Sequence, residues 1–239
     1  MARGKGNREG AQGIMVNAGF MLLLSGAVLT VLGIAFHRPL LYLFGASEVT
    51  YPYASSYIVI YLIGTLCVML SLGLNPYINC QGFARTGMLT VALGAAANIV
   101  LDPIFIFALH LGVRGAAIAT VLSQLLSAAW VVKFLTGKKA ELKLDFRGFR
   151  PDWHCIQRIT VLGIASFVMS FTDTLVQVAC NATLRNFGGD LYISVMTVLN
   201  SVRQIAQTPV LAIADGASTA ISYNYGARLY RRTRDASGL

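Results

Sequence analysis

The sequence carries little charge for its length. Only 12% of its 239 residues are Asp, Glu, Lys or Arg, whereas 56% are hydrophobic. Average soluble domains carry about a quarter charged residues, and a soluble chain of this size would need more charge to cover its surface. The charged residues also gather in short clusters between long uncharged runs. This distribution predicts an integral membrane protein.

The motifs of several other function classes are also missing. The four cysteines are widely spaced and form no C-x-x-C pair, and the three histidines show no metal-ligand spacing. No Ser/His/Asp set and no phosphate-binding loop is present, so we expect neither an enzyme nor a bound cofactor. The net charge of +9 comes from residues beside apolar runs and not from one polar face, which argues against a nucleic-acid partner.

Six long apolar segments are present. A helix needs about 20 residues to cross the hydrocarbon core of a bilayer, and these runs lack the strict alternation of strands. We therefore expect an all-α integral membrane protein with six transmembrane helices, at residues 14–36, 53–78, 86–109, 115–132, 159–184 and 191–223. The first is too long for a signal peptide. The sixth exceeds one crossing, and we expect a single helix kinked at Pro209.

The segments are separated by short polar stretches and one long loop. We expect the first segment to end at His37-Arg38-Pro39, and turns at residues 81–87, 112–115 and 186–190. Residues 137–158 form the long polar loop.

The distribution of basic residues predicts the orientation, because Lys and Arg favour cytoplasmic loops. Three of them, Arg38, Arg114 and Arg185, lie on one side, and Arg203 lies within the sixth segment. The other fifteen of the nineteen lie on the opposite side: Arg3, Lys5, Arg8, Arg85, Lys133, Lys138, Lys139, Lys143, Arg147, Arg150, Arg158, Arg228, Arg231, Arg232 and Arg234. Both termini and the long loop are therefore predicted to be cytoplasmic, in a multi-pass protein of the cell membrane.

Asp102 is the strongest candidate for a functional residue. An acid inside a membrane span is costly and usually faces a bundle interior or a cavity. Asn98 precedes it by four residues, so both lie on one helix face. Pro103 has no N–H and leaves the carbonyl of Ile99 without its helical partner. These oxygens suit a hard cation such as Na⁺, or a proton on the carboxylate. The alternative is a proline kink with a local Asn–Asp hydrogen bond and no ion.

Asp173, Gln177 and Asn181 form a second polar stripe at helical spacing. It is a candidate site for substrate or proton, and hydrogen bonding between helices is an equally good interpretation. Arg203 and Asp215 are the remaining ionisable residues inside spans, and a structural role is favoured for both.

Several motifs resemble those of the multidrug and toxic compound extrusion (MATE) transporters. The stretches NIVLDPIFIF at 98–107 and LGVRGAAIAT at 111–120 resemble the family's fifth and sixth helices. NYGA at 224–227 resembles the end of its eighth helix, and RGKGNREGA at 3–11 the loop after its second. The resemblance therefore implies family helices three to eight of a twelve-helix, two-lobe bundle.

The resemblance also implies a division of the chain and roles for its residues. Residues 1–136 would belong to the N-lobe, 137–158 would be the cytoplasmic loop between lobes, and 159–239 would begin the C-lobe. Family members place an Asn, an Asp four residues later and a Thr of the next helix around the coupling cation. These correspond to Asn98, Asp102 and Thr120. Asp173 falls near an acid that some members use in the seventh helix.

The resemblance implies an exporter of drugs or other organic, cationic small molecules that is driven by Na⁺ or H⁺. Family helices one, two and nine to twelve are not covered, so we expect a truncated chain, or one that gains helices from another chain or by self-association. One alternative is a flippase of lipid-linked oligosaccharides with a related fold, whose usual sign is a cationic cavity. The other is a membrane fragment or partner subunit that does not transport.

Overall fold

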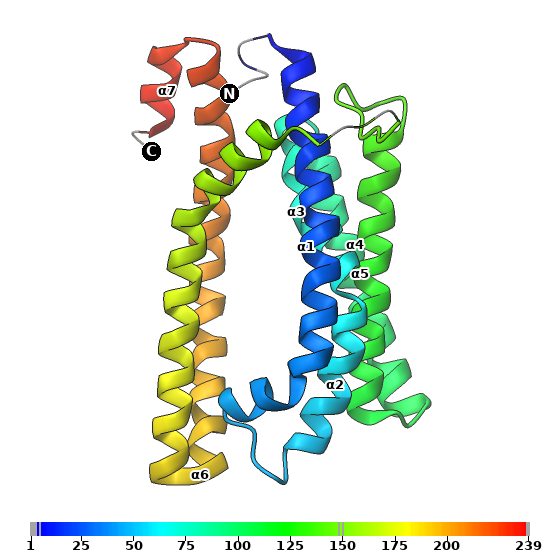
Figure 1. Cartoon of the computed structure of the whole chain (residues 1–239), viewed down its shortest axis with the longest axis vertical. Helices are drawn as coiled ribbons and strands as arrows, with labels where there is room; N and C mark the ends of the chain where they lie inside the picture. The colour runs from blue at the N-terminus through cyan, green and yellow to red at the C-terminus, as the bar shows by residue number, and fades with distance from the viewer. Residues whose placement is uncertain (1–3, 5, 148, 150, 238–239) are drawn as a thin grey trace. The chain divides into compact units, whose positions relative to one another are not determined.

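The computed structural model describes residues 4, 6–147, 149 and 151–237, and in them every regular element is a helix. The elements, drawn in Figure 1, are α1 (Arg8–Leu43), α2 (Tyr51–Ile63), α3 (Thr65–Cys80), α4 (Ala84–Pro103), the π-helix η1 (Ile104–Ala108), α5 (Gly112–Thr136), α6 (Trp153–Gly226) and α7 (Tyr230–Ser237). The prediction of an all-α protein is confirmed. Arg3, Lys5 and Arg150, three of the basic residues used to predict orientation, lie outside the described residues.

The chain divides into two compact units. The first is Gln12–Thr172, which holds most of α1, all of α2 to α5 and the start of α6. The second consists of Met1–Ala11 and Asp173–Leu239, with the rest of α6 and α7.

The first helix is longer than predicted. The prediction that His37-Arg38-Pro39 ends it is wrong, because α1 continues through Pro39 to Leu43. A proline removes one helical hydrogen bond and tends to kink a helix without always ending it. The last turns of α1 bend aside from the preceding ones (Figure 1).

The second predicted segment, residues 53–78, is two helices and not one. The helices α2 and α3 meet at Gly64 with a bend of 56°. A Cβ on Gly64 would lie against the Val121 side chain of α5. Glycine therefore lets the bend pack directly onto α5, a tertiary contact that no local pattern reveals.

Pro103 ends the regular part of α4, as its chemistry predicts. The π-helix η1 follows at once, and the N–H of Leu109 donates to the carbonyl of Ile104 at 2.9 Å. The predicted turn at 112–115 is misplaced by a few residues. The turn lies at His110 and Leu111, and Gly112, with a φ of 54°, begins α5.

The predicted turn at 186–190 is confirmed. Gly189 has a φ of 60° and a ψ of −151°, which interrupts α6. Gln177 and Asn200, at nearly equal separations from Gly189, are hydrogen-bonded at 3.4 Å, so the two arms of α6 run back along each other. No such break occurs at Pro209, which lies inside the helix. The long loop ends earlier than expected, because α6 begins at Trp153.

Four helices among the described residues are long and apolar enough to cross a membrane: Arg8–Leu43, Ala84–Ala108, Gly112–Thr136 and Trp153–Gly189. The bent pair α2–α3 would make a fifth. These account for the first five predicted segments. The sixth, residues 191–223, is helical but is not among them. It carries Arg203 and Asp215 among many hydroxyl and amide side chains.

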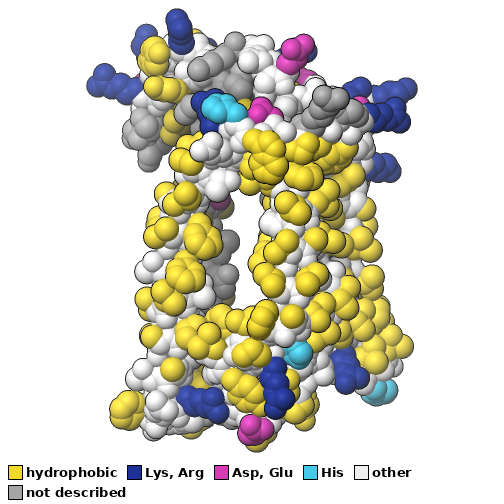
Figure 2. All heavy atoms as spheres, in the orientation of Figure 1, with side chains coloured by type: hydrophobic (Ala, Val, Ile, Leu, Met, Phe, Trp, Pro, Cys, Tyr) yellow, Lys and Arg dark blue, Asp and Glu magenta, His cyan; other side chains and the backbone are white. Residues whose placement is uncertain are grey.

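Large apolar side chains are widely exposed, for example Leu162 at 81% and Phe187 at 85%. On the face drawn in Figure 2, such side chains cover the middle of the helices, and charged ones gather near the helix ends. Apolar exposure on this scale is disfavoured in water and suits lipid. Together with the four to five candidate spans, it identifies a multi-pass membrane protein.

Gly115 offers a test of the packing in the first unit. A Cβ on this buried residue would lie 2.5 Å from the backbone oxygen of Phe105 in η1, and a backbone atom cannot move aside cheaply. We predict that Gly115→Ala lowers the melting temperature in detergent, because such overpacking costs about 1–3 kcal/mol. Gly13→Ala is the matched control, since nothing lies within 4 Å of a Cβ there. An equal loss in both variants would contradict the prediction.

Candidate functional site

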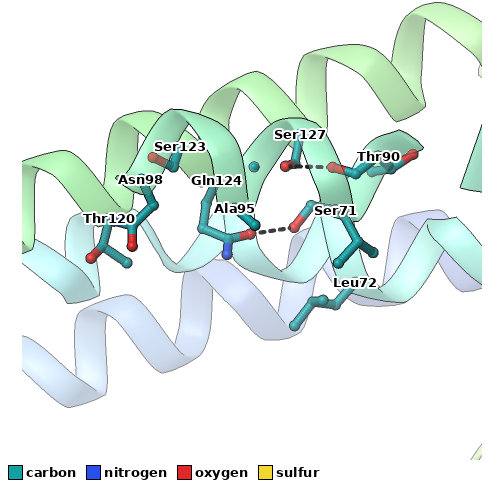
Figure 3. A pocket seen from close by; sticks show the side chains of 11 residues that line it. Ser71, Leu72, Thr90, Ala95, Asn98, Thr120, Ser123, Gln124 and Ser127 are labelled. Atoms are coloured by element: carbon teal, nitrogen blue, oxygen red, sulfur yellow. Dashed lines mark hydrogen bonds between the residues drawn. The ribbon is translucent and has the colours of Figure 1, made fainter. Parts of the chain in front are cut away.

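A polar cavity lies within the first unit, between α3, α4 and α5 (Figure 3). Its volume is about 220 Å³. Most of its lining side chains carry a hydroxyl or an amide, and none carries a charge. The lining residues are Ser71, Leu72, Thr90, Val91, Gly94, Ala95, Asn98, Thr120, Ser123, Gln124 and Ser127.

Small residues and hydroxyl groups set the width of this cavity. A Cβ on the buried Gly94 of α4 would collide with the Ser127 hydroxyl, so glycine is what lets α4 and α5 approach here. The Ser127 hydroxyl donates across the helices to the carbonyl of Thr90 at 3.1 Å. The Ser71 hydroxyl of α3 donates to Oε1 of Gln124 at 2.8 Å (Figure 3). Three helices are thus joined by side chains that also line the cavity.

The residues predicted for the cation site are close to one another. Nδ2 of Asn98 donates to Oδ1 of Asp102 at 3.2 Å, so the predicted common face is present. Asn98 and Thr120 both line the cavity, from α4 and α5 (Figure 3). Asp102 is half-buried and is joined to the cavity through Asn98, without lining it directly.

The hydrogen bonds leave oxygen atoms available for a ligand. Asn98 uses its amide nitrogen toward Asp102, so its carbonyl oxygen keeps its acceptor capacity. The Thr120 hydroxyl donates to the carbonyl of Ala116 at 2.9 Å, which leaves its lone pairs free. Such a set can hold a hard cation through neutral oxygens beside one carboxylate. Among the described residues, no group of three or more His, Cys, Asp or Glu side chains forms a metal site.

The second predicted stripe lies in the second unit, where two of its three members interact. Nε2 of Gln177 donates to Oδ1 of Asn181 at 3.5 Å, and Nδ2 of Asn200 donates to Oε1 of Gln177 at 3.4 Å. Asp173 is exposed and takes no part in this chain of amides. The hydrogen bonding between helices that the sequence allowed is therefore present for Gln177. Asn200 was not predicted.

The sequence prediction also missed most of the cavity wall. Thr120, Ser123, Gln124 and Ser127 follow the i, i+3, i+4, i+7 spacing of one helix face. That polar stripe is visible in the sequence and could have marked α5 as a cavity wall. Ser71 and Thr90 carry no comparable local signal, since their position depends on how α3 and α4 pack.

The known proteins that are similar to this chain are MATE proteins. The MatE family model matches residues 1–104. The chain is 26% identical over 203 residues to the multidrug export protein MepA of Staphylococcus haemolyticus, which covers 85% of this chain and 45% of that protein. The crystal structure of a MATE protein in the bent conformation matches 98% of this chain and 53% of its own, with 26% identity and a TM-score of 0.84.

This chain is similar to MATE transporters along nearly its whole length. The outward-facing conformation of a multidrug resistance MATE family transporter also matches, with 25% identity, a TM-score of 0.85, and coverage of 98% of this chain and 52% of that one. The chain spans about half the length of the MATE proteins it matches. The similarity to a family of transporters is in line with the expectation that the chain is not an enzyme. Its fold matches half of a MATE fold.

The bond between Ser127 and Thr90 provides a test of the cavity wall. We predict that Ser127→Ala lowers the unfolding free energy by about 0.5–1.5 kcal/mol, because a buried hydrogen bond between helices is lost. Thr136→Ala is the control, since the Thr136 hydroxyl bonds only within its own helix and is exposed. Melting in detergent micelles would measure both. A melting temperature of Ser127→Ala that is no lower than that of Thr136→Ala would contradict the bond between Ser127 and Thr90.

Proposed function

We propose that this chain is part of a cation-coupled antiporter that exports drugs or other organic, cationic small molecules. The observation that carries this proposal is that Asn98 of α4 and Thr120 of α5 line one cavity, with Asp102 hydrogen-bonded to Asn98 at its edge. The match of residues 1–104 to the MatE family model and the similarity to multidrug export proteins support the choice of substrate class.

In this proposal, Asp102 binds the coupling ion and Asn98 and Thr120 supply neutral oxygens. A sodium ion would be held by these oxygens, whereas a proton would sit on the Asp102 carboxylate. Either ion neutralises a charge that is costly inside the membrane. Ion binding would therefore favour one conformation of the bundle over the other, which couples ion entry to substrate exit.

The stripe of Asp173, Gln177 and Asn181 is proposed as a second polar site, for substrate or proton. The amides of Gln177 and Asn181 already bond to each other and to Asn200, which holds them in place. Asp173, exposed and outside that chain of amides, is the member that can change its protonation or partner.

We further propose six membrane crossings, with the arm of α6 after Gly189 as the sixth. The turn at Gly189 and the bond between Gln177 and Asn200 support it, because a partner arm that crosses the membrane runs alongside. The excess of Lys and Arg supports cytoplasmic termini and a cytoplasmic loop at 137–158 in the plasma membrane. The lobe assignment, N-lobe to residue 136 and C-lobe from residue 159, is part of this proposal.

Export can be tested with everted vesicles from cells that produce the chain, alone and together with its flanking coding sequence. We predict that Asp102→Asn lowers ethidium accumulation at least about tenfold, because the variant lacks the carboxylate that would bind the coupling ion in every transport cycle. Asp145→Asn is the control, since Asp145 lies exposed in the loop. A Na⁺ gradient and a pH gradient are imposed in separate experiments, and the gradient that drives accumulation identifies the coupling ion. Unchanged accumulation in the Asp102 variant would refute its role.

The topology can be tested with single cysteines in a variant that lacks the four native ones. We predict that Lys139→Cys reacts with a membrane-impermeant maleimide only from the cytoplasmic side, and Phe187→Cys only from outside. Both positions are exposed, so burial does not limit labelling. Labelling of both residues from the same side would contradict the orientation and the fifth crossing.

A further inference from the structure

A second cavity lies in the first unit, where α2 and α5 begin. Its volume is about 470 Å³. Its wall comes from the first turns of α2, from the turn that precedes α5 and from the first residues of α5 itself. The lining residues are Pro52, Tyr53, Ser56, His110, Leu111, Gly112, Val113 and Arg114. None of them lines the polar cavity between α3, α4 and α5, so the two cavities are separate.

The ionisable groups of this second cavity favour an anion. Arg114 carries a positive charge, His110 can gain one, and no lining residue is acidic. The side chains of Arg114, His110 and Ser56 form no hydrogen bond or ion pair with another residue that the structure describes. Glu48, the acid that precedes α2, accepts a hydrogen bond from the Tyr42 hydroxyl at 3.2 Å. The donors in the wall are therefore available to a ligand that accepts hydrogen bonds.

The backbone that leads into α5 supports the same choice of ligand. His110 and Gly112 have φ values of 53° and 54°, so the chain turns sharply between η1 and α5. The N–H of Leu111 donates to the carbonyl of Phe105 at 3.2 Å. No side chain caps the start of α5, so the N–H groups of its first turn have no partner within the helix. The guanidinium of Arg114 belongs to that same turn.

The position of the second cavity indicates where such a ligand comes from. The candidate span Ala84–Ala108 ends just before the lining residue His110, and the candidate span Gly112–Thr136 begins within the wall. The bent pair α2–α3 begins at Tyr51, next to the wall. The ends of membrane spans lie near the level of the lipid headgroups. The cavity thus lies where headgroup phosphates are found, and part of its wall is apolar, at Pro52, Tyr53, Leu111 and Val113.

We propose that this cavity binds the phosphate of an anionic lipid, with Arg114 as the principal ligand and Ser56 and His110 as further donors. A guanidinium binds phosphate oxygens through two parallel N–H groups, which a single ammonium cannot do. An anionic headgroup is favoured over a zwitterionic one, because the latter brings its own cation to a cavity that already holds one. The bound lipid would join the start of α2 to the start of α5. This inference depends neither on export nor on the Asp102 site.

The test counts the lipids bound to the purified full chain, by native mass spectrometry from detergent micelles. The chain is titrated with phosphatidylglycerol, which is anionic, and separately with phosphatidylcholine of the same acyl chains. We expect Arg114→Gln to bind phosphatidylglycerol at this site at least about tenfold more weakly than the parent, because a charged hydrogen-bonded contact is lost. Arg114→Lys keeps the charge without the paired donors and should lose less affinity.

Arg38→Gln is the matched control, since Arg38 is an exposed arginine of the same unit that does not line the cavity. It should bind phosphatidylglycerol as the parent does. Equal affinity in Arg114→Gln and the parent would overturn the proposal, and so would an equal loss in Arg38→Gln, which would indicate a general effect of net charge. Phosphatidylcholine bound as tightly as phosphatidylglycerol would contradict the preference for an anionic headgroup.

Two further measurements identify the ligand and guard against loss of the fold. Excess inorganic phosphate is added in a parallel titration, and complete displacement of the lipid would assign the site to free phosphate and overturn the proposal. The melting temperature of each variant without added lipid shows whether it is folded. If Arg114→Gln is not, His110→Gln and Ser56→Ala decide, since each removes one donor from the wall and should weaken binding of phosphatidylglycerol. Unchanged binding in both would overturn the proposal.

Discussion

The close approach of α4 to α5 is the constraint on which the candidate site depends. Gly94 allows the Ser127 hydroxyl to reach the Thr90 carbonyl, and Gly115 allows the start of α5 to pass the backbone of η1. Without a strong hydrophobic drive between helices in lipid, packing of small residues and hydrogen bonds between helices determine which faces meet. The faces that meet here are polar ones, so the contact that joins the helices also forms the wall of the cavity. The side chains that hold the helices together are therefore also those that line the candidate site.

The sequence predicted the fold class well because the bilayer imposes strong, local requirements. Each of the first five apolar runs corresponds to a candidate span, and the glycines at 188 and 189 marked the reversal within α6. The errors concern helix bends and helix ends, some of which depend on tertiary contacts. The bend at Gly64 depends on Val121 of α5, which is distant in sequence, and α1 continues past Pro39 although a proline often precedes a helix end.

The candidate site was also predicted only in part, because local spacing places some of its residues and tertiary packing places the others. The Asn98–Asp102 pair follows from helical spacing alone, and the hydrogen bond between them is present. The grouping of Thr120 with Asn98 was implied only by a family resemblance, since no local sequence pattern links two residues on different helices. In the structure both residues line one cavity. Gln124 and Ser71 were missed, because their bond joins α3 to α5 across a long stretch of sequence.

The loop at residues 138–147, here called the strap, is bonded to Gln81 and Leu135, and these contacts have an implication for the order of assembly. Asn17, Gly19, Leu74, Gln81 and Leu135 all precede it in the chain. A growing chain folds its N-terminal parts first, so the strap finds its partners already made when it leaves the ribosome. It can therefore dock, and Asp152 can cap the first turn of α6, before the arm beyond Gly189 has been synthesised. Docking of the strap would then mark the completion of the first helical bundle during membrane insertion.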